Sequence, residues 1–143
     1  MISFTIPGAP VGKQRPKFSR CGGFVRTYTP EKTVSYESLV RLSFAAAYPA
    51  FVPLEGPVRF TVRAFCPIPN SAPKRLRADM EAERLPCPKK PDKTNIEKII
   101  EDALNGIAYK DDSQITDSGP FMKRYSPRPR VEVEIQSLEE GRG

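Results

Sequence analysis

The chain of 143 residues contains no histidine and no tryptophan. The missing histidine excludes a histidine general base, a Ser-His-Asp triad, a histidine-ligated zinc site and a histidine-dependent nuclease motif. Any catalysis must therefore use carboxylates, lysine, hydroxyl groups, thiols or a bound metal ion.

Cysteine and long hydrophobic segments are also scarce. The three cysteines are widely spaced and form no CxxC pair, which favours ordinary reduced thiols over a disulfide framework or a zinc ribbon. No apolar run approaches the roughly 18 residues that a membrane span needs, and residues 1–5 lack the features of a signal peptide. We therefore expect a cytoplasmic protein without a membrane segment.

Charge is present in quantity but is unevenly placed. The formal net charge is +6, and residues 1–50 hold seven basic and two acidic side chains. Residues 91–117 reverse this balance, with three basic and seven acidic side chains. A basic surface attracts a polyanion, while clustered carboxylates repel one unless a cation lies among them. The pattern is typical of a metal-dependent nucleic-acid enzyme, although a basic protein with one acidic solvated helix has the same distribution.

The hydrophobic pattern predicts one α+β domain spanning residues 1–143, with a mixed β-sheet and two main helices on one face. Strands are expected at 2–6, 24–28, 58–65, 121–125 and 131–135, the last two as a closing pair and 58–65 with a basic outer face. Helices are expected from Thr29-Pro30-Glu31 to about residue 47, near 74–83, and at 94–104. The remaining segments are a basic loop at 7–27, a proline-rich loop at 66–91 and a frayed tail at 137–143.

The helix at 94–104 is the clearest element, because its apolar residues recur at i, i+3, i+4, i+7 and i+8. Thr94 and Glu97 fit a capping box, and Asn105-Gly106 provides a C-cap. Asp92 lies just before the helix and Asp111-Asp112 follow it, so the three acids converge only if the connector doubles back.

These residues suit a metal site that needs no histidine. Mg²⁺ is typically held by one or two carboxylates with water and substrate phosphate, and Lys98 could offset phosphate charge. Ordinary alternatives stay open: Asp92 as a helix-start acid, Asp111-Asp112 as a turn, and Lys98 as a solvated surface residue.

Three motifs together resemble the RusA family of Holliday junction resolvases. They are Lys90-Pro91-Asp92 with Asn95 and Lys98 at the helix start, Asp102-Ala103-Leu104-Asn105-Gly106 at its end, and Asp111-Asp112-Ser113-Gln114 in the following turn. The segments at 6–8, 11–16 and 28–30 are similar to prophage members of the family, so the resemblance covers nearly the whole chain.

The resemblance implies a Mg²⁺-dependent endonuclease that acts as a homodimer and resolves four-way DNA junctions by paired nicks during recombination and repair. It assigns the metal site to Asp92 and Asp112 with Asp111 beside them, and makes Lys98 the essential lysine. Thr94 stands where the family has a second aspartate before the helix. Metal then binds through the remaining acids with Thr94 as a ligand or water holder, or the protein binds junctions but cuts them poorly.

The DNA contacts are expected to come from basic residues outside the acidic segment. We expect phosphate contacts, which position DNA without reading sequence, mainly from the basic loop residues Lys13, Arg15, Lys17, Arg20 and Arg26. Arg59, Arg63, Lys89 and Lys90 are secondary positions. A C2 dimer would present two equivalent sites to the approximate two-fold symmetry of a junction. A third hypothesis treats the acidic segment as a surface for a protein partner.

Overall fold

The computed structural model describes residues 1–28 and 30–139, with the side chains of several residues in the 17–28 segment left out. The strands are β1 (Ile2–Pro7), β2 (Lys17–Cys21), β3 (Phe24–Tyr28), β4 (Val58–Pro67), β5 (Ile115–Ser118), β6 (Met122–Ser126) and β7 (Arg130–Ser137). The helices are α1 (Glu31–Ala47), α2 (Lys74–Glu81) and α3 (Lys93–Leu104), with a short 3-10 helix η1 (Asp112–Gln114).

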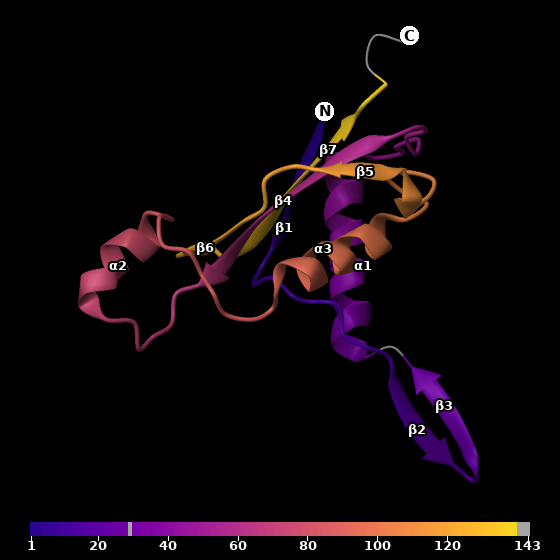
Figure 1. Ribbon diagram of the computed structural model, residues 1–143, viewed down its shortest axis with the longest axis horizontal. Helices are drawn as coiled ribbons and strands as arrows, with labels where there is room; N and C mark the ends of the chain where they lie inside the picture. Colours follow the sequence, from indigo (N-terminus) through magenta and orange to yellow (C-terminus); the bar gives the residue numbers. More distant parts are fainter. Residues whose placement is uncertain (29, 140–143) are drawn as a thin grey trace.

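The main sheet is mixed and has β4 at its centre (Figure 1). Strands β1 and β7 are antiparallel, and β7 is antiparallel to β4. On the other side of β4, β5 pairs in parallel with its first half and β6 pairs in parallel with its second half. The expected α+β class with a mixed sheet is therefore confirmed.

Helices α1 and α3 share one hydrophobic core with the sheet. The inward residues of β1, of β7 and of β4 as far as Ala64 alternate with exposed or half-buried ones, as a strand with one covered face requires. The whole predicted apolar stripe of α3 is buried in this core: Ile96, Ile99, Ile100, Ala103 and Leu104. Burial of this stripe fixes the side of α3 that faces solvent, which carries the polar residues discussed below.

The predicted closing strands do not pair with each other. Strands β6 and β7 lie on opposite sides of β4, and residues 127–129 carry the chain past the end of β4. Pro127 and Pro129 remove two backbone donors from this connection, which disfavours a tight hairpin. The expectation of a pair at this place is wrong, although both strands exist.

The outer face of β4 is not a free basic surface. Arg63 forms ion pairs with Glu132 and Glu134 of β7, and Arg59 lies 3.7 Å from a carboxylate oxygen of Asp117 on β5. The acidic partners come from neighbouring strands, so the strand's own sequence could not reveal them. Arg59 and Arg63 are thereby poorer candidates for DNA contacts than the sequence suggests.

The proline-rich segment 66–91 contains the expected short helix, α2, which lies at one end of the molecule (Figure 1). A second small core joins this segment to the sheet through Cys66, Met80, Cys87 and Tyr125. Residues 85–87 hydrogen-bond to β6, with the amide of Cys87 donating to the carbonyl oxygen of Lys123. These contacts anchor the segment just before it enters α3. Within residues 1–28 and 30–139, no helix is both long and apolar enough to cross a membrane.

Candidate active site

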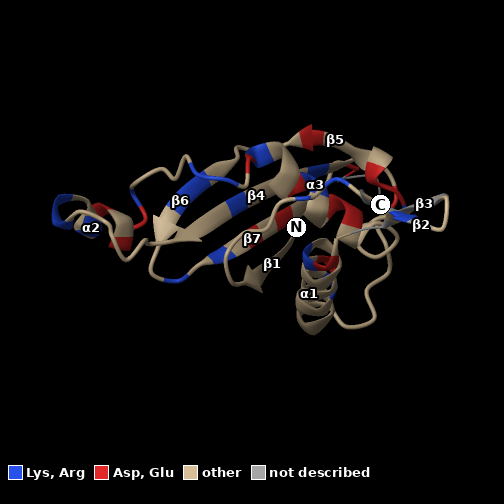
Figure 2. Ribbon diagram, turned by 90° about the horizontal axis from the view of Figure 1, so that it is seen from below, with Lys and Arg blue, Asp and Glu red and all other residues tan. Residues whose placement is uncertain are grey.

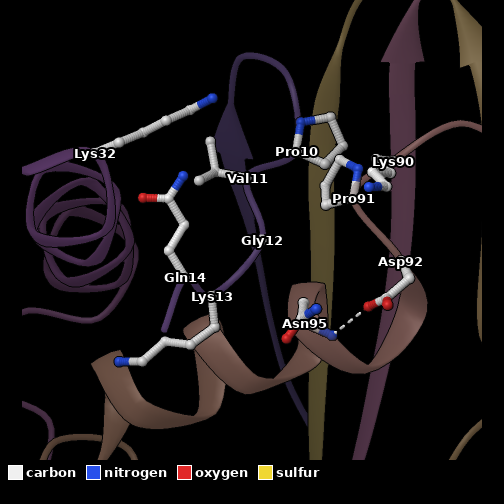
Figure 3. A pocket seen from close by; sticks show the side chains of 10 residues that line it. All are labelled: Pro10, Val11, Gly12, Lys13, Gln14, Lys32, Lys90, Pro91, Asp92 and Asn95. Carbon is white, nitrogen blue, oxygen red and sulfur yellow. Dashed lines mark hydrogen bonds between the residues drawn. The ribbon is translucent and has the colours of Figure 1, made fainter. Parts of the chain in front are cut away.

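A cleft lies where the loop after β1 meets the start of α3 (Figure 3). Its volume is about 420 Å³. Its lining residues are Pro10, Val11, Gly12, Lys13, Gln14, Lys32, Lys90, Pro91, Asp92 and Asn95. Two segments that are far apart in sequence, both singled out by motif, thus form one concave surface.

The loop is docked on α3 by a backbone contact at Gly12. The amide of Lys13 donates a hydrogen bond of 2.9 Å to the carbonyl oxygen of Asn95. A Cβ placed on Gly12 would lie 2.6 Å from the Cβ of Pro91 and 3.2 Å from that of Asn95. Only glycine lets the loop approach the helix start this closely.

Replacing Gly12 with alanine is expected to push the loop off α3 and to destabilise the protein by about 1–3 kcal/mol, the usual cost of overpacking. Denaturant unfolding measures this loss. The double variant Gly12→Ala/Pro91→Gly should lose less than the sum of the two single changes, because it removes the closest clash. Strict additivity of the two changes would show that the loop and the helix start are not packed as described.

Asp92 begins α3 as its N-cap. Its side chain accepts a 2.9 Å hydrogen bond from the amide of Asn95, and its carboxylate is exposed in the cleft (Figure 3). The predicted Thr94–Glu97 capping box is therefore wrong, because Asp92 already occupies the capping position. Thr94 lies in the first turn with its side chain exposed, and Glu97 is instead buried and paired with Lys93 at 2.8 Å.

The segment that leads into Asp92 is held by Lys123 of β6. Its ammonium group donates to the carbonyl oxygens of Lys89 and of Pro91, the latter at 2.8 Å. Pro91 immediately precedes Asp92, so this amino group fixes the approach of the chain to the N-cap. Lys89 and Lys90 remain exposed, as a phosphate contact requires.

Lys13 has a different environment from the one expected of a free phosphate ligand. Its Nζ atom lies 2.9 Å from Glu37 of α1 and 3.1 Å from Asp102 of α3. Partial burial favours the neutral amine, but the two carboxylates outweigh it and raise the pKa of Lys13. Lys13 therefore ties the loop to both helices as a permanent cation.

Asp102 brings Lys13 and Lys98 together. One oxygen of Asp102 faces Lys13, while the other lies 3.4 Å from Nζ of Lys98, which is half-exposed. From the sequence, Asp102 was named only as part of the motif at the end of the helix and was given no role, although its i,i+4 spacing from Lys98 is a signal for such a pair. Nothing in the sequence pointed to Lys32 as a residue of the cleft. It lines the cleft because the fold places α1 beside the loop after β1.

The connector after α3 folds back along the last turns of the helix. Gly106, with φ +80°, allows the reversal. The buried Tyr109 hydroxyl then donates a 2.7 Å hydrogen bond to the carbonyl oxygen of Glu101. The connector therefore turns back along α3 as far as Glu101 and brings the following acidic turn to the second half of the helix, whereas Asp92 lies at its start. The convergence of Asp92 with Asp111 and Asp112 stays a prediction.

The acidic turn is built by Asp111 and Gln114. The Ser113 side chain and then its amide, which donates to the Asp111 carboxylate at 3.1 Å, lower the pKa of that carboxyl. The Gln114 side chain accepts from the Asp111 amide and donates to the carbonyl oxygens of Leu54 and Gly56. Asp111 and Gln114 thus have structural roles, while the Asp112 side chain stays half-buried beside α3.

The Asp112 carboxylate lies near enough to α3 to affect the pKa of Glu101. Burial raises the pKa of Glu101, and the nearby carboxylates of Glu97, Asp102 and Asp112 raise it further. Figure 2 shows acidic residues gathered around α3 and β5, whereas β6 is mainly basic. The opposing effect of the nearby Lys98 ammonium group only partly offsets this repulsion.

The donor set fits Mg²⁺ in kind, because Asp92, Asp111 and Asp112 offer carboxylate oxygens and Thr94 offers a hydroxyl. Asp112 and Lys98 do not line the cleft that holds Asp92. Within the part of the chain that the structure describes, no three histidine, cysteine, aspartate or glutamate side chains are grouped so as to hold a metal ion. A Mg²⁺ ion here would therefore use one or two carboxylates with water and phosphate, which is usual for this ion.

The remaining predicted DNA contacts lie on the 7–27 segment. Arg15 and Arg20 are exposed, in agreement with a role in phosphate binding. The side chains of Lys17 and Arg26 lie outside the described residues, as does Thr29 at the expected start of α1. In the structure Pro30 precedes the first residue of α1.

Comparison with known proteins identifies the family. The family described as Endodeoxyribonuclease RusA matches residues 7–136, which is most of the chain. The chain belongs to the RusA endodeoxyribonuclease family. The match includes the loop after β1, the cleft, α3 and the acidic turn.

The chain is also similar to a protein of Bacillus subtilis (strain 168). That protein, called uncharacterized protein YqaN, is 37% identical over 139 residues, covering 96% of both chains. The similarity extends over nearly the full length of both proteins. The description of the matched family names endodeoxyribonuclease activity.

Proposed function

We propose that this protein is a Mg²⁺-dependent endonuclease that resolves four-way DNA junctions by paired hydrolysis of phosphodiester bonds. The observation that carries the proposal is the arrangement around α3. The motif loop at 11–14 and the basic residues Lys32 and Lys90 line the same cleft as Asp92, while the acidic turn lies beside the second half of α3. Membership of the RusA family supports this chemistry.

Each side chain has a distinct role in the proposal. Asp92 and Asp112 would each supply a carboxylate oxygen to the ion, with water and substrate phosphate completing its ligands and with Asp111 and Thr94 as additional oxygen donors. The bound ion would polarise a phosphoryl oxygen and make a water more acidic. Lys98 neutralises charge on the scissile phosphate, exchanging its contact with Asp102 for one with DNA. Lys89, Lys90, Arg15 and Arg20 bind flanking phosphates.

Two active sites are required for two symmetric nicks, so we propose that the protein works as a homodimer. A C2 dimer presents equivalent sites related by the approximate two-fold axis of the junction. Measurement of the mass in solution, free and with junction, tests this part of the proposal. Two chains per junction are expected, and one chain per resolved junction would contradict it.

A second function is favoured by one residue. Thr94 replaces the second aspartate that the family pattern has before the helix, so the ion loses one charged ligand. The alternative is a protein that binds junctions but cleaves them weakly. The two functions share the basic surface and differ in the rate of hydrolysis.

Cleavage of a synthetic four-way junction tests the proposal. Labelling each of the four strands in turn and adding Mg²⁺ should reveal nicks at symmetric positions on two opposing strands. A linear duplex of the same sequence serves as the control and should stay intact. Junction binding without Mg²⁺-dependent nicks would favour the second function, and absence of binding at low salt would contradict both.

A further inference from the structure

Strands β2 and β3 form an arm that extends away from the sheet and the helices (Figure 1). They pair in register from Lys17–Tyr28 to Cys21–Phe24. The turn is Gly22-Gly23, with φ values of +58° and +88°, the combination that a two-residue type I′ hairpin needs. The geometry of the arm is thus set by its own backbone, because β2 and β3 make most of their contacts with each other.

One face of the arm exposes apolar side chains. The register places Phe18 opposite Thr27 and Arg20 opposite Val25, and side chains of alternate residues share a face. Phe18 is 72% exposed and Val25 is 58% exposed. A phenyl ring and a β-branched side chain next to an arginine are typical of a contact surface rather than of a solvated loop.

The charge of the arm indicates the partner. The arm, residues 17–28, contains the basic residues Lys17, Arg20 and Arg26 and no acidic one, and Arg15 lies just before it. A second copy of the arm would be repelled by the same positive charge. A polyanion is attracted, and a nucleic acid is a polyanion that also offers flat apolar surfaces in its bases.

The phenyl ring of Phe18 can stack on a base only where a neighbouring base does not already cover its face. In linear duplex DNA the base faces cover one another, so basic residues reach phosphates but a phenyl ring gains nothing. At a branch point that the bound protein holds open, the helical stacks are interrupted and base faces become accessible. Aromatic side chains bind such faces with little sequence preference.

We infer that the Phe18 face of the arm stacks on bases at the branch point, with Arg20 on an adjacent phosphate, and that this contact distinguishes branched from linear DNA. The inference rests on the proposed function. The arm starts at Lys17, three residues after Gln14 of the cleft, so a branch point on the arm lies next to the candidate active site.

The missing tryptophan makes a direct test possible. A Phe18→Trp variant carries the single tryptophan of the chain, and its fluorescence is expected to be strongly quenched by a four-way junction and little changed by a linear duplex. Leu42→Trp is the matched control, because Leu42 is 68% exposed on α1. Its emission should respond equally to both DNAs.

Phe18→Ala supplies the affinity measurement. Its junction affinity should fall about 5- to 100-fold, the usual effect of losing one base–aromatic stack, while its duplex affinity and thermal unfolding stay at wild-type values. Leu42→Ala should leave both affinities unchanged. An Arg20→Gln variant should weaken binding to both DNAs and reduce the slope of log affinity against log salt by about one.

Several results would overturn the inference. One is equal quenching of the Phe18→Trp variant by junction and duplex, and another is an unchanged preference of Phe18→Ala for junctions. A third is a change in the oligomeric state of Phe18→Ala without DNA, which would make the arm a contact between proteins. Wild-type cleavage is measured in parallel. Wild-type cleavage without selective quenching in Phe18→Trp overturns the role of the arm alone, whereas failure of the wild type to bind and cut junctions overturns the proposed function as well.

Discussion

An Asp112→Asn variant is expected to lose junction cleavage by roughly 100- to 1,000-fold while still binding junctions, as well as the wild type or more tightly. An amide is a neutral and weaker ligand for Mg²⁺ than a carboxylate. The substitution also removes a negative charge that faces the DNA phosphates. Single-turnover cleavage in Mg²⁺ and junction affinity in EDTA measure the two effects separately.

The fold should survive this substitution. The acidic turn is held by Asp111 and Gln114, whose hydrogen bonds do not involve the Asp112 side chain, so thermal unfolding should be unchanged. Asp117→Asn is the matched control, because Asp117 is an exposed acid of β5 outside the motif. Cleavage by Asp112→Asn at the wild-type rate would show that the assignment of the site is wrong.

A Thr94→Asp variant is expected to raise the cleavage rate about tenfold or more and to lower the Mg²⁺ concentration at half-maximal rate. Thr94 is exposed in the first turn of α3, so a carboxylate fits there without a steric clash. The helix dipole favours a negative charge at this position by about 0.3–1 kcal/mol. The added ligand would restore the family pattern beside Asp92.

Thr94→Asn separates charge from size. It has nearly the volume of aspartate but no charge, so it should keep the wild-type rate and Mg²⁺ dependence. An unchanged rate and Mg²⁺ dependence in Thr94→Asp would mean that position 94 does not ligate the ion. A rise in rate would mean that the natural threonine restrains catalysis.

The parts of the fold that are local in sequence could be predicted. The apolar stripe of α3 determines both the helix and the side that it buries, and the alternation in β4 and β7 determines their inward faces. The predicted start of α3 is one residue late because Asp92 competes with Thr94 for the capping position. Both residues are ordinary N-caps, so composition alone does not choose between them.

The parts that depend on distant contacts could not be predicted. Strand β5 and the hairpin partner β2 carry weak patterns, and their pairing is decided by neighbours elsewhere in the chain. The same holds for Lys13, which is a free cation in the sequence but is paired with Glu37 and Asp102 in the fold. The motif located the candidate site on α3, and only the structure revealed that Gly12 and Lys32 complete the cleft.

The initial rate of junction cleavage as a function of Mg²⁺ concentration tests the central proposal most directly. Purified wild-type protein should produce no nicks in EDTA and paired nicks on opposing strands that increase with Mg²⁺ to saturation. Salt-sensitive binding of the junction with no nicks at any Mg²⁺ concentration would contradict an endonuclease and leave a junction-binding protein.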